Sequence, residues 1–406
     1  SADCNGDGIV DYGQILDGTV VDLDQDGVPD ECVAPTADVC PNGCEYSNID
    51  DAIAAADDGD TILVGPGTYT GAGNVVFNAS GKDLAIIGIA GADQTIYDGE
   101  NQRACAWVHD NSGKIVTFVG LTFRNGLGKS SIPGSMNGGG LSVWKDSHVV
   151  VRECRFESNH APYDGGAMWV RDRSSAIIES CTFIDNTSGN VGGGIRARGE
   201  STCAEDDSTV VIRDTIFEAN ENPINFYHGG TPSAAPSHLI ERCVFIDNTE
   251  PFDDAPSDEY GMIRFGSCNP GESILRNCII VHDPADGFAI SADQNGPPGD
   301  AAGYRRNLFL GSLSPTDVRG DITDLGENIF GTEADRLADC DADGIIDAIA
   351  ILDGLVDDCN GNLIADDCEL NATYAASEPG TPAGPTDYVT FDVSSLPDAR
   401  DTVSIE

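Results

Sequence analysis

The chain has 406 residues, of which 69 are acidic and 21 are basic, and its formal net charge at pH 7 is −48. That balance excludes nucleic acid as a partner, because phosphate binding rests on lysine and arginine, and it disfavours anionic membranes. With 40% hydrophobic residues the chain can still bury a core, so it is not a disordered acidic tail.

The chain begins with two acidic loops, DCNGDGIVDYGQ at 3–14 and DLDQDGVPDECV at 22–33. Calcium prefers six to eight oxygen ligands, which a twelve-residue loop supplies from positions 1, 3, 5, 7, 9 and 12. We therefore predict a calcium-binding module over residues 1–33. Its ligands are Asp3, Asn5, Asp7, the Ile9 carbonyl, Asp11 and Gln14 in the first loop, and Asp22, Asp24, Asp26, the Val28 carbonyl and Asp30 in the second.

A short helix is predicted next, within YSNIDDAIAAADDGDTILVGPGTYT at 46–70. Ser47 or Asn48 is its N-cap, Ile49 to Ala56 carry its apolar face, and TILVGPGTY then forms a strand and turn. The segment resembles the N-terminal cap of many pectin-lyase-like β-helices. Such a cap is needed because an open solenoid end exposes unpaired strand edges.

From about residue 115 the sequence repeats itself. One motif occurs six times, as LTFRN (121–125), CRFESN (154–159), CTFIDN (181–186), TIFEAN (215–220), CVFIDN (243–248) and CIIVHD (278–283). A second motif lies between its copies, as GGGLSV (138–143), GGAMWV (165–170) and GGGIRA (192–197). Stretches such as HVVVREC alternate apolar and polar residues, which is typical of half-buried strands.

Irregular repeat lengths argue against hairpins and favour stacked coils, each pairing with the next. We predict an all-β chain in which residues 34–338 form a right-handed single-stranded parallel β-helix of about ten coils. Five phenylalanines should stack inside it, and five asparagines should form a ladder at one corner. These are Phe123, Phe156, Phe183, Phe217 and Phe245, and Asn125, Asn159, Asn186, Asn220 and Asn248.

Residues 339–369 repeat the opening module, with loops that again start 19 residues apart (339 and 358, as 3 and 22). The predicted ligands are Asp339, Asp341, Asp343, the Ile345 carbonyl and Asp347, then Asp358, Asn360, Asn362, the Ile364 carbonyl, Asp366 and Glu369. Position 12 is Val33 in the second loop and Ala350 in the third, and Leu363 replaces the turn glycine of the fourth. The missing oxygens must come from water, a neighbouring loop or another chain. Calcium is thus the predicted cofactor.

The chain then continues with a linker at 370–386 and a tail at 387–406. The tail contains YVTFDVSS (388–395), which reads as a strand. A lone strand is unstable, so it should pair with its own β-helix or with the edge of a neighbouring copy.

Two family resemblances follow from these motifs. The acidic loops resemble thrombospondin type 3 repeats and the calcium repeats of dockerins, which implies docking onto a larger assembly. The FxxN and GGA[ILV] motifs over about 120–285 are similar to those of the chlamydial polymorphic outer-membrane proteins, whose passenger domains are β-helical adhesins. FESN, FIDN, FEAN, GGAM and GGGI match that pattern, whereas FRNG and VHD depart from it.

The fourteen cysteines and the calcium loops indicate an extracellular protein, and the start at Ser1, directly ahead of the first loop, fits a processed chain. We predict two disulfides that clamp the modules, Cys4–Cys32 and Cys340–Cys368, and a local loop at Cys40 and Cys44. The cysteines ahead of the FxxN stretches should instead form a free, apolar interior line; they are Cys154, Cys181, Cys243 and Cys278. Cys105, Cys203, Cys268 and Cys359 have no assignable partner.

The sequence favours a non-enzymatic role, with a β-helical polysaccharide lyase as the alternative. The GHG and RxK motifs of polygalacturonase-like enzymes are absent. Arg171 and Arg173 flank Asp172 and are candidates for a lyase-type site, although an ion-paired surface is the favoured interpretation. Trp144 and Trp169 lie in equivalent glycine-containing repeats and either stack on sugar rings or pack outside the coils.

We therefore expect a secreted, calcium-binding structural or adhesive protein. Its end modules would join it head-to-tail to other copies or to cell-surface components. The alternative is a carbohydrate-active or polysaccharide-binding β-helix, anchored by a dockerin-like module. No apolar run is long enough to span a membrane.

Overall fold

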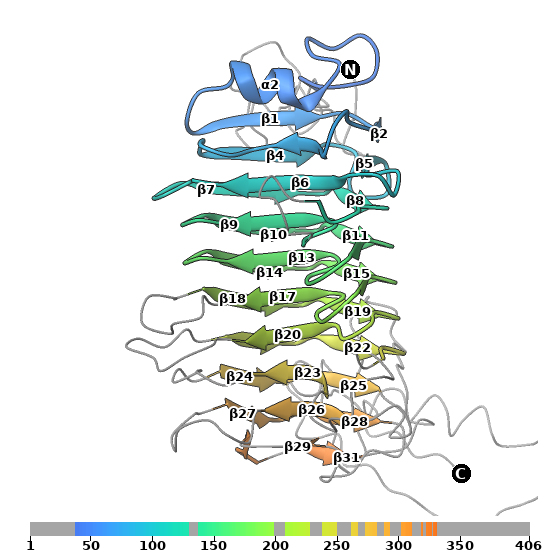
Figure 1. Cartoon of the computed structure of the whole chain (residues 1–406), viewed down its shortest axis with the longest axis vertical. Coiled ribbons are helices and arrows are strands. Elements are labelled where there is room, and N and C mark those ends of the chain that lie inside the picture. The colour runs from blue at the N-terminus through green and yellow to red at the C-terminus, as the bar shows by residue number, and fades with distance from the viewer. Residues whose placement is uncertain are drawn as a thin grey trace, which may run out of the picture. The chain divides into compact units, whose positions relative to one another are not determined.

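The computed structural model describes residues 37–129, 137–198, 208–227, 238–249, 261–266, 273–281, 288–292, 302–310, 318–319, 322–326 and 328–330. The chain divides into two units, 1–337 and 338–406, and every described residue belongs to the first. That unit is a stack of β-coils beneath one short helix (Figure 1). Both predicted calcium modules, the linker and the tail lie outside the described residues and stay predictions.

Three parallel sheets run along the stack, because nine of the described coils contribute one strand to each of them and the last contributes a strand to two. Sheet A contains β1 (Asp60–Val64), β4 (Leu84–Gly88), β7 (Ile115–Val119), β10 (His148–Arg152), β14 (Ser175–Glu179), β18 (Thr209–Arg213), β21 (Leu239–Glu241), β24 (Ser273–Arg276), β27 (Ala302–Arg305) and β30 (Ile322–Asp324). Sheet B contains β2 (Gly67–Tyr69), β5 (Thr95–Asp98), β8 (Thr122–Arg124), β11 (Arg155–Glu157), β15 (Thr182–Ile184), β19 (Ile216–Glu218), β22 (Val244–Ile246), β25 (Ile279–Val281), β28 (Leu308–Leu310) and β31 (Ile329–Phe330).

Sheet C contains β3 (Val75–Asn78), β6 (Ala104–His109), β9 (Leu141–Trp144), β13 (Met168–Arg171), β17 (Ile195–Arg198), β20 (Ile224–Tyr227), β23 (Gly261–Phe265), β26 (Phe288–Ala292) and β29 (Val318–Arg319). A fourth, two-stranded sheet pairs β12 (His160–Ala161) with β16 (Thr187–Ser188). Sheets A and B each have ten strands, which confirms the predicted parallel β-helix of about ten coils.

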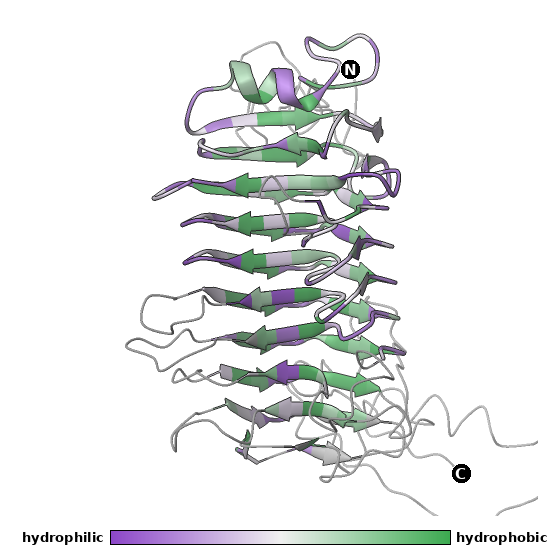
Figure 2. Ribbon diagram, viewed as in Figure 1, coloured by the Kyte–Doolittle hydropathy of each residue, from purple (hydrophilic) through white to green (hydrophobic). Residues whose placement is uncertain are grey.

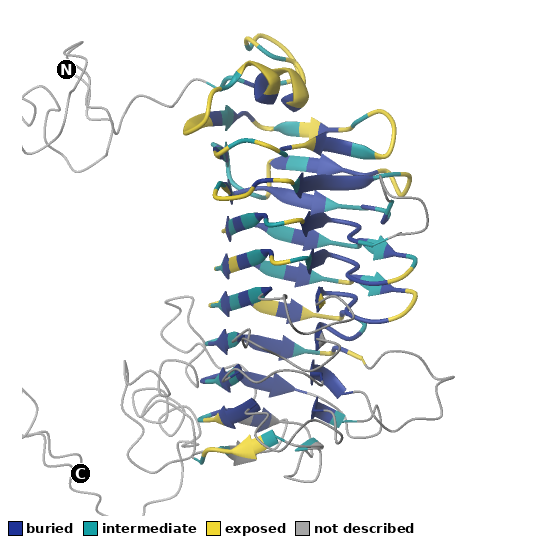
Figure 3. Ribbon diagram, turned by 60° about the vertical axis from the view of Figure 1, so that its left-hand side comes forward, coloured by how far each residue is buried: buried dark blue, intermediate teal, exposed yellow. Residues whose placement is uncertain are grey.

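The strands alternate between the core and the surface. In β10, Val149 and Val151 are buried, whereas Val150 between them faces outward. Figure 3 shows this burial along the strands and the exposure of several turns. The predicted phenylalanine stack is confirmed: the ring centroids of Phe156 and Phe183 are 4.7 Å apart, and the spacing continues at 4.8 Å to Phe217.

In the coils that carry the asparagine ladder, the residue before each ladder asparagine adopts the left-handed region. Ser158 and Asp185, for example, have φ of 52° and are followed by buried Asn159 and Asn186. The predicted ladder is confirmed at Asn159, Asn186, Asn220 and Asn248, which bond to one another from coil to coil. Asn125 was wrongly included. Asn125 itself adopts the left-handed conformation (φ 50°), as Ser158 and Asp185 do in their coils. Gly126 therefore occupies the ladder position, and its backbone amide donates to Asn159 Oδ1.

The first coil is covered by α2 (Ile49–Ala55), close to the predicted helix. Asn48 is its N-cap and accepts a hydrogen bond from the Asp51 amide, while Lys82 Nζ donates to the carbonyls of Ile53 and Ala56 at its other end. Within the described residues, no helix is long and apolar enough to pass through a membrane.

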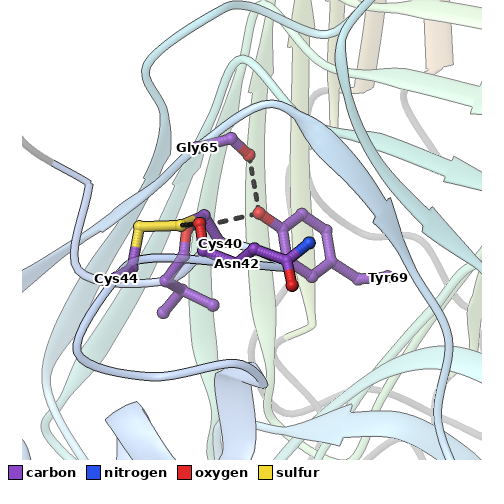
Figure 4. The surroundings of a disulfide bond; sticks show 6 residues. Cys40, Asn42, Cys44, Gly65 and Tyr69 are labelled. Carbon is purple, nitrogen blue, oxygen red and sulfur yellow. Dashed lines mark hydrogen bonds between the residues drawn. A yellow bond between two sulfur atoms is a disulfide. The ribbon is translucent and has the colours of Figure 1, made fainter.

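A disulfide between Cys40 and Cys44 closes the loop that precedes this helix, as the sequence suggested (Figure 4). Beside it, the Tyr69 hydroxyl donates to the Gly65 carbonyl at 2.7 Å. The predicted free interior line is also confirmed, since Cys154, Cys181, Cys243 and Cys278 are buried and form no disulfide. Cys105 is likewise free and buried, whereas the two module disulfides lie outside the described residues.

Candidate functional site

The outer face of sheet C carries large aromatic and basic side chains in register. One outward position on successive strands forms a single column that runs along the stack, which we call the Trp–Arg column. Its members are Trp107, Ser142, Trp169, Arg196, Asn225, Arg264 and Ser291. In Figure 2 the hydrophilic patches in the middle of β17, β20 and β23 mark its polar half.

A second outward column lies two residues further along each strand. It contains His109, Trp144, Arg171 and Arg198. The two tryptophans that the sequence placed in equivalent positions therefore belong to neighbouring columns. Trp169 aligns with Ser142, whereas Trp144 aligns with His109.

The paired glycines of the GG motif hold the chain against the Trp–Arg column. Gly138, Gly165 and Gly192 all adopt the left-handed region, with φ of 60°, 70° and 69°. A Cβ on Gly165 would lie 2.8 Å from the Cβ of Trp169, and one on Gly192 would lie 2.9 Å from the Cβ of Arg196. Only glycine satisfies both the φ value and the close approach. The side chains of the column are consequently nearly buried, although they project from the outer face of sheet C.

The three tryptophans pack together outside the main core. Trp107, Trp144 and Trp169 form a cluster of their own with Ala104, and they are 7%, 5% and 5% exposed. Ring centroids are 6.1 Å apart for Trp107 and Trp144 and 6.4 Å apart for Trp144 and Trp169. The aromatic cluster is therefore contiguous over β6, β9 and β13.

Two polar side chains cover this cluster. The His109 ring stacks on Trp144 with a centroid separation of 4.4 Å, and the Arg171 guanidinium lies 5.6 Å from the centre of the Trp169 ring. The Arg171 side chain keeps 32% of its surface exposed. A cation over an indole face is a favourable electrostatic arrangement that another flat or polar group can replace.

The indole N–H groups of this cluster find no acceptor among the described residues. Nε1 of Trp107, Trp144 and Trp169 is buried there without a hydrogen-bond partner, and so is Oδ1 of Asn225 in the polar half of the column. Buried tryptophan N–H groups usually do find a partner, and exceptions require an explanation. Three unpaired donors on one outer surface are unusual for a cluster that serves packing alone.

The arginines named by the sequence are ion-paired, as the favoured interpretation expected. Arg173 bonds Asp146 through Nε at 2.6 Å and Nη2 at 2.7 Å, and this hydrogen bonding lowers the pKa of Asp146. Arg171 Nε donates to Asp172 at 2.7 Å. Only Arg171 belongs to the outer face of sheet C, because Arg173 follows the end of β13.

Other acids sit at the border of the same face. Asp110 lies between His109 Nδ1 (2.7 Å) and Lys145 Nζ (3.2 Å), and hydrogen bonds from these two groups lower its pKa. Asp164, almost fully buried, accepts from Asn190 Nδ2 at 2.7 Å and lies 3.6 Å from Arg198 Nη1. These carboxylates keep the basic side chains of the second column in fixed positions.

Metal ligands are not gathered among the residues that the structure describes. No group of three or more histidine, cysteine or acidic side chains is arranged there to hold a metal ion, and all predicted calcium ligands lie elsewhere in the chain. A cavity of about 580 Å³ beside α2 is lined by Asn48, Asp50, Asp51 and Tyr69, among others. Burial raises the pKa of Asp50, which accepts from the Asn78 amide at 3.2 Å.

Sequence reasoning missed Trp107, Arg196, Asn225 and Arg264 as members of the site. Arg196 was detectable, because it stands four residues after the first glycine of its motif, as Trp169 does. The strands that carry Trp107 and Asn225 have no glycine pair ahead of them. Before Arg264 there is a single glycine, Gly261, which precedes it by three residues instead of four. Their place in the column depends on the strand register.

Comparison with known proteins agrees with the fold. A family model described as a right handed beta helix region matches residues 89–280, which confirms the predicted handedness. No curated protein matches the sequence. The resemblances to chlamydial outer-membrane proteins, thrombospondin repeats and dockerins stay predictions.

Solved structures with some likeness include a pectin methylesterase from carrot, at 14% identity over 72% of this chain and 89% of that one, with a TM-score of 0.45. A pectin methylesterase from Erwinia chrysanthemi is 15% identical over 71% and 93%, with a TM-score of 0.35. A PL6 family alginate lyase is 15% identical over 70% and 50%, with a TM-score of 0.31. The activities in these names belong to those proteins.

Proposed function

We propose that this chain is an extracellular polysaccharide-binding β-helix whose binding surface is the outer face of sheet C. The observation that carries the proposal is the cluster of Trp107, Trp144 and Trp169, with three unpaired indole N–H groups outside the core. The proposal ranks ahead of the structural or adhesive role, because the tryptophan cluster lies among the described residues, whereas the two terminal modules lie outside them.

The chemistry of the face suits a sugar chain. Indole faces pack against the C–H surface of a sugar ring, and indole N–H groups donate to its hydroxyl oxygens. Arg171 stands over Trp169 and is partly exposed, so a sugar ring that takes its place exchanges one favourable contact for another. Serine, asparagine and arginine in the same column then supply further donors and acceptors.

Packing alone is the competing explanation. It accounts for the burial of the indoles but leaves three donors without acceptors, at a cost of about 1–3 kcal/mol for each fully unsatisfied group. A ligand or ordered water would satisfy them. A polysaccharide explains the donors, the aromatic faces and the neighbouring arginines together.

In this proposal calcium orders the two terminal modules that would anchor the protein, and it takes no part in binding the polysaccharide. The four loops at 3–14, 22–33, 339–350 and 358–369 would bind calcium through the ligands named above, and metal binding would order them. Calcium titration of the full chain, followed by calorimetry, tests this. Asp343→Ala removes a position-5 ligand of the third loop and should lower the number of ions bound.

The test of the binding face is electrophoresis through gels that contain one polysaccharide each, neutral or acidic. Trp169→Leu should lose the retardation that the wild-type chain shows. The control is Ile177→Ala, a change at an exposed residue on β14 of sheet A. Equal retardation of both variants would overturn the proposal, provided that each unfolds at a midpoint close to the wild type.

The second candidate is the head-to-tail structural or adhesive protein. It is favoured by the duplicated modules at 1–33 and 339–369, of which the second and third loops lack a position-12 oxygen, at Val33 and Ala350. A ligand from another copy would complete such a loop. Light scattering should then show calcium-dependent growth that a chelator reverses, and a monomer at saturating calcium would count against it.

A further inference from the structure

We infer that the outer face of sheet A is a self-association surface, on which a second copy of this chain packs face to face in the antiparallel direction. The pattern of charge on the face identifies the partner, because that pattern is complementary to its own reverse. This surface is separate from the polysaccharide-binding face on sheet C and from the calcium modules, since all its residues lie on strands of sheet A.

Outward positions in the middle of sheet A form an apolar column on five successive strands. Its members, in register from β10 to β24, are Val150, Ile177, Val211, Leu239 and Ile274. None of them is fully buried, and Ile177 is 37% exposed. With neighbouring strands about 4.8 Å apart, the column is roughly 19 Å long. Sheet C buries its outer column, whereas sheet A leaves this apolar column in contact with water.

A column of alternating charge, which we call the charge ladder, runs beside the apolar column and two residues further along each strand. Its members, in the same register, are Arg152, Glu179, Arg213, Glu241 and Arg276. The Glu179 carboxylate lies 2.8 Å from Arg152 Nε and 3.1 Å from Arg213 Nη1. Arg213 Nε lies 3.4 Å from Glu241. The sign of the charge therefore changes at every strand, and the ion pairs hold the side chains along the ladder.

A second copy can place its own charge ladder opposite this one only when it is turned end for end. Two faces that meet around a two-fold axis parallel to the strands have ladders that run in opposite directions. An axis over a strand would place like charges opposite each other, such as Arg213 and Arg213 of the second copy. An axis midway between two strands places opposite charges together, because the sign changes at each step.

The axis between β14 and β18 gives the best match of charge. It places Glu179 opposite Arg213 of the second copy, and Arg152 opposite Glu241 of the second copy. The next axis, between β18 and β21, would instead place Arg152 opposite Arg305 of the second copy, because Arg305 follows the ladder in register. Juxtaposed like charges disfavour a wrong arrangement strongly, so the ladder selects one register.

The same axis brings the two apolar columns together. Ile177 then lies opposite Val211 of the second copy, and Val150 lies opposite Leu239. Six strands of up to five residues cover roughly 29 Å by 16 Å on each copy. The total of about 900 Å² is small for a specific interface, so we expect a weak dimer with a Kd on the order of 10 μM.

Sedimentation equilibrium of the full chain, at concentrations on either side of the expected Kd, tests the association. We expect a reversible monomer–dimer equilibrium with the same Kd in saturating calcium and in excess chelator, because no residue of the face is a predicted calcium ligand. A chain that stays monomeric would overturn the inference and leave the proposed function intact. Association that needs calcium would also overturn it, and would assign the contact to the terminal modules.

One pair of variants tests the apolar column. Ile177→Asp would bury a carboxylate opposite Val211 of the second copy, so the Kd should rise at least about tenfold. Ile216→Asp is the matched control, because Ile216 is 39% exposed on β19 of sheet B, and its Kd should stay within about twofold of the wild type. Equal Kd values for the two variants would overturn the inference.

The charge ladder allows a test that a role in stability alone would fail. Arg213→Glu places two carboxylates opposite each other across the axis, so the Kd should rise at least about tenfold. Adding Glu179→Arg restores opposite charges across the axis, although it places like charges side by side within each copy. The double variant should therefore unfold more easily than the wild type and still dimerise almost as well. A double variant that dimerises no better than Arg213→Glu would overturn the antiparallel register.

If the double variant does not fold, cross-linking decides. Val150→Cys combined with Leu239→Cys places two thiols that face each other between copies but lie three strands, or roughly 14 Å, apart within one copy. Facing sheets pack about 10 Å apart, so a short bismaleimide should give a covalent dimer. Val150→Cys combined with Ile274→Cys is the control, because neither new thiol then faces another. Equal yields of dimer from the two variants, or none from the first, would overturn the inference.

Discussion

The Nδ2 atom of Asn186 lies 2.8 Å from the Oδ1 atom of Asn220, one coil further along the chain. Asn186 Nδ2 also donates to the Phe156 carbonyl at 3.0 Å, and its Oδ1 accepts from the amide of Asn159 at 3.0 Å. Each asparagine of the ladder thus satisfies one backbone carbonyl and one backbone amide of the preceding coil at a buried corner. Without such side chains these groups would be buried and unpaired.

Asn186→Ala should accordingly lower the free energy of unfolding by about 3 kcal/mol, because several buried hydrogen bonds are lost and their partners stay unpaired. Urea denaturation followed by circular dichroism measures this. Glu218→Gln, at an exposed position of β19, is the control and should change stability by less than about 0.5 kcal/mol. A loss of that small size in Asn186→Ala would contradict the structural role of the ladder.

A pair of glycines tests how the chain approaches the Trp–Arg column. Gly165→Ala and Gly113→Ala both place a Cβ at positive φ, 70° and 73°, but only the first meets crowded atoms, 2.6 Å from the Met168 carbonyl oxygen. We expect Gly113→Ala to cost about 1–2 kcal/mol and Gly165→Ala clearly more. Denaturation midpoints give the comparison. Equal costs would mean that the close approach does not matter.

The interior cysteines should be chemically inert in the folded protein. Burial raises the pKa of Cys181 to about 12 and raises the pKa of Cys154 and Cys278 as well. Iodoacetamide at pH 8 should leave these three thiols unmodified until the chain is denatured, since the thiolate is the reactive form. Peptide mass spectrometry resolves each site. Rapid labelling of Cys181 under native conditions would show that the coil opens there.

Glu179 gives a pH dependence of stability. Arg152 Nε donates to it at 2.8 Å and Arg213 Nη1 lies 3.1 Å away, and these partners lower its pKa, Arg152 most. A lowered folded-state pKa stabilises the protein above the ordinary glutamate value of about 4.3, and the benefit disappears as pH falls through the folded-state value.

Glu179→Gln should therefore reduce the free energy of unfolding by about 0.5–1 kcal/mol at pH 7 and by little below about pH 3. Thermal or urea unfolding at a series of pH values measures the difference between the two chains. A difference that grows as the pH falls would have the wrong sign for this account.

Much of the β-helix was predictable because its repeats place one residue type at one offset. Phe156 and Phe183 each precede their ladder asparagine by three residues, so counting gave the stack and the ladder together. The prediction for Asn125 was wrong because only one residue separates it from Phe123, whereas two residues separate phenylalanine from asparagine in the other motifs. The earliest coils were harder to predict, since Tyr97 replaces phenylalanine in register with Phe123.

The candidate site was predictable only in part. The sequence places Trp144 and Trp169 in equivalent glycine-containing repeats, but their assignment to different columns needs the exact strand register. Loops of unequal length separate Arg196, Asn225 and Arg264, so their alignment does not follow from spacing. The unpaired state of an indole N–H depends on every neighbouring atom in three dimensions and has no signal in the sequence.

The tryptophan fluorescence of the full chain offers the most direct test of the binding face. All three tryptophans of the chain, Trp107, Trp144 and Trp169, belong to the cluster on sheet C, so emission reports on that face alone. Titration with a polysaccharide that retards the chain should give a saturable change in emission, with the same midpoint as the heat of binding. Binding heat without a change in emission would place the site elsewhere, and the absence of binding to any polysaccharide would contradict the proposed function.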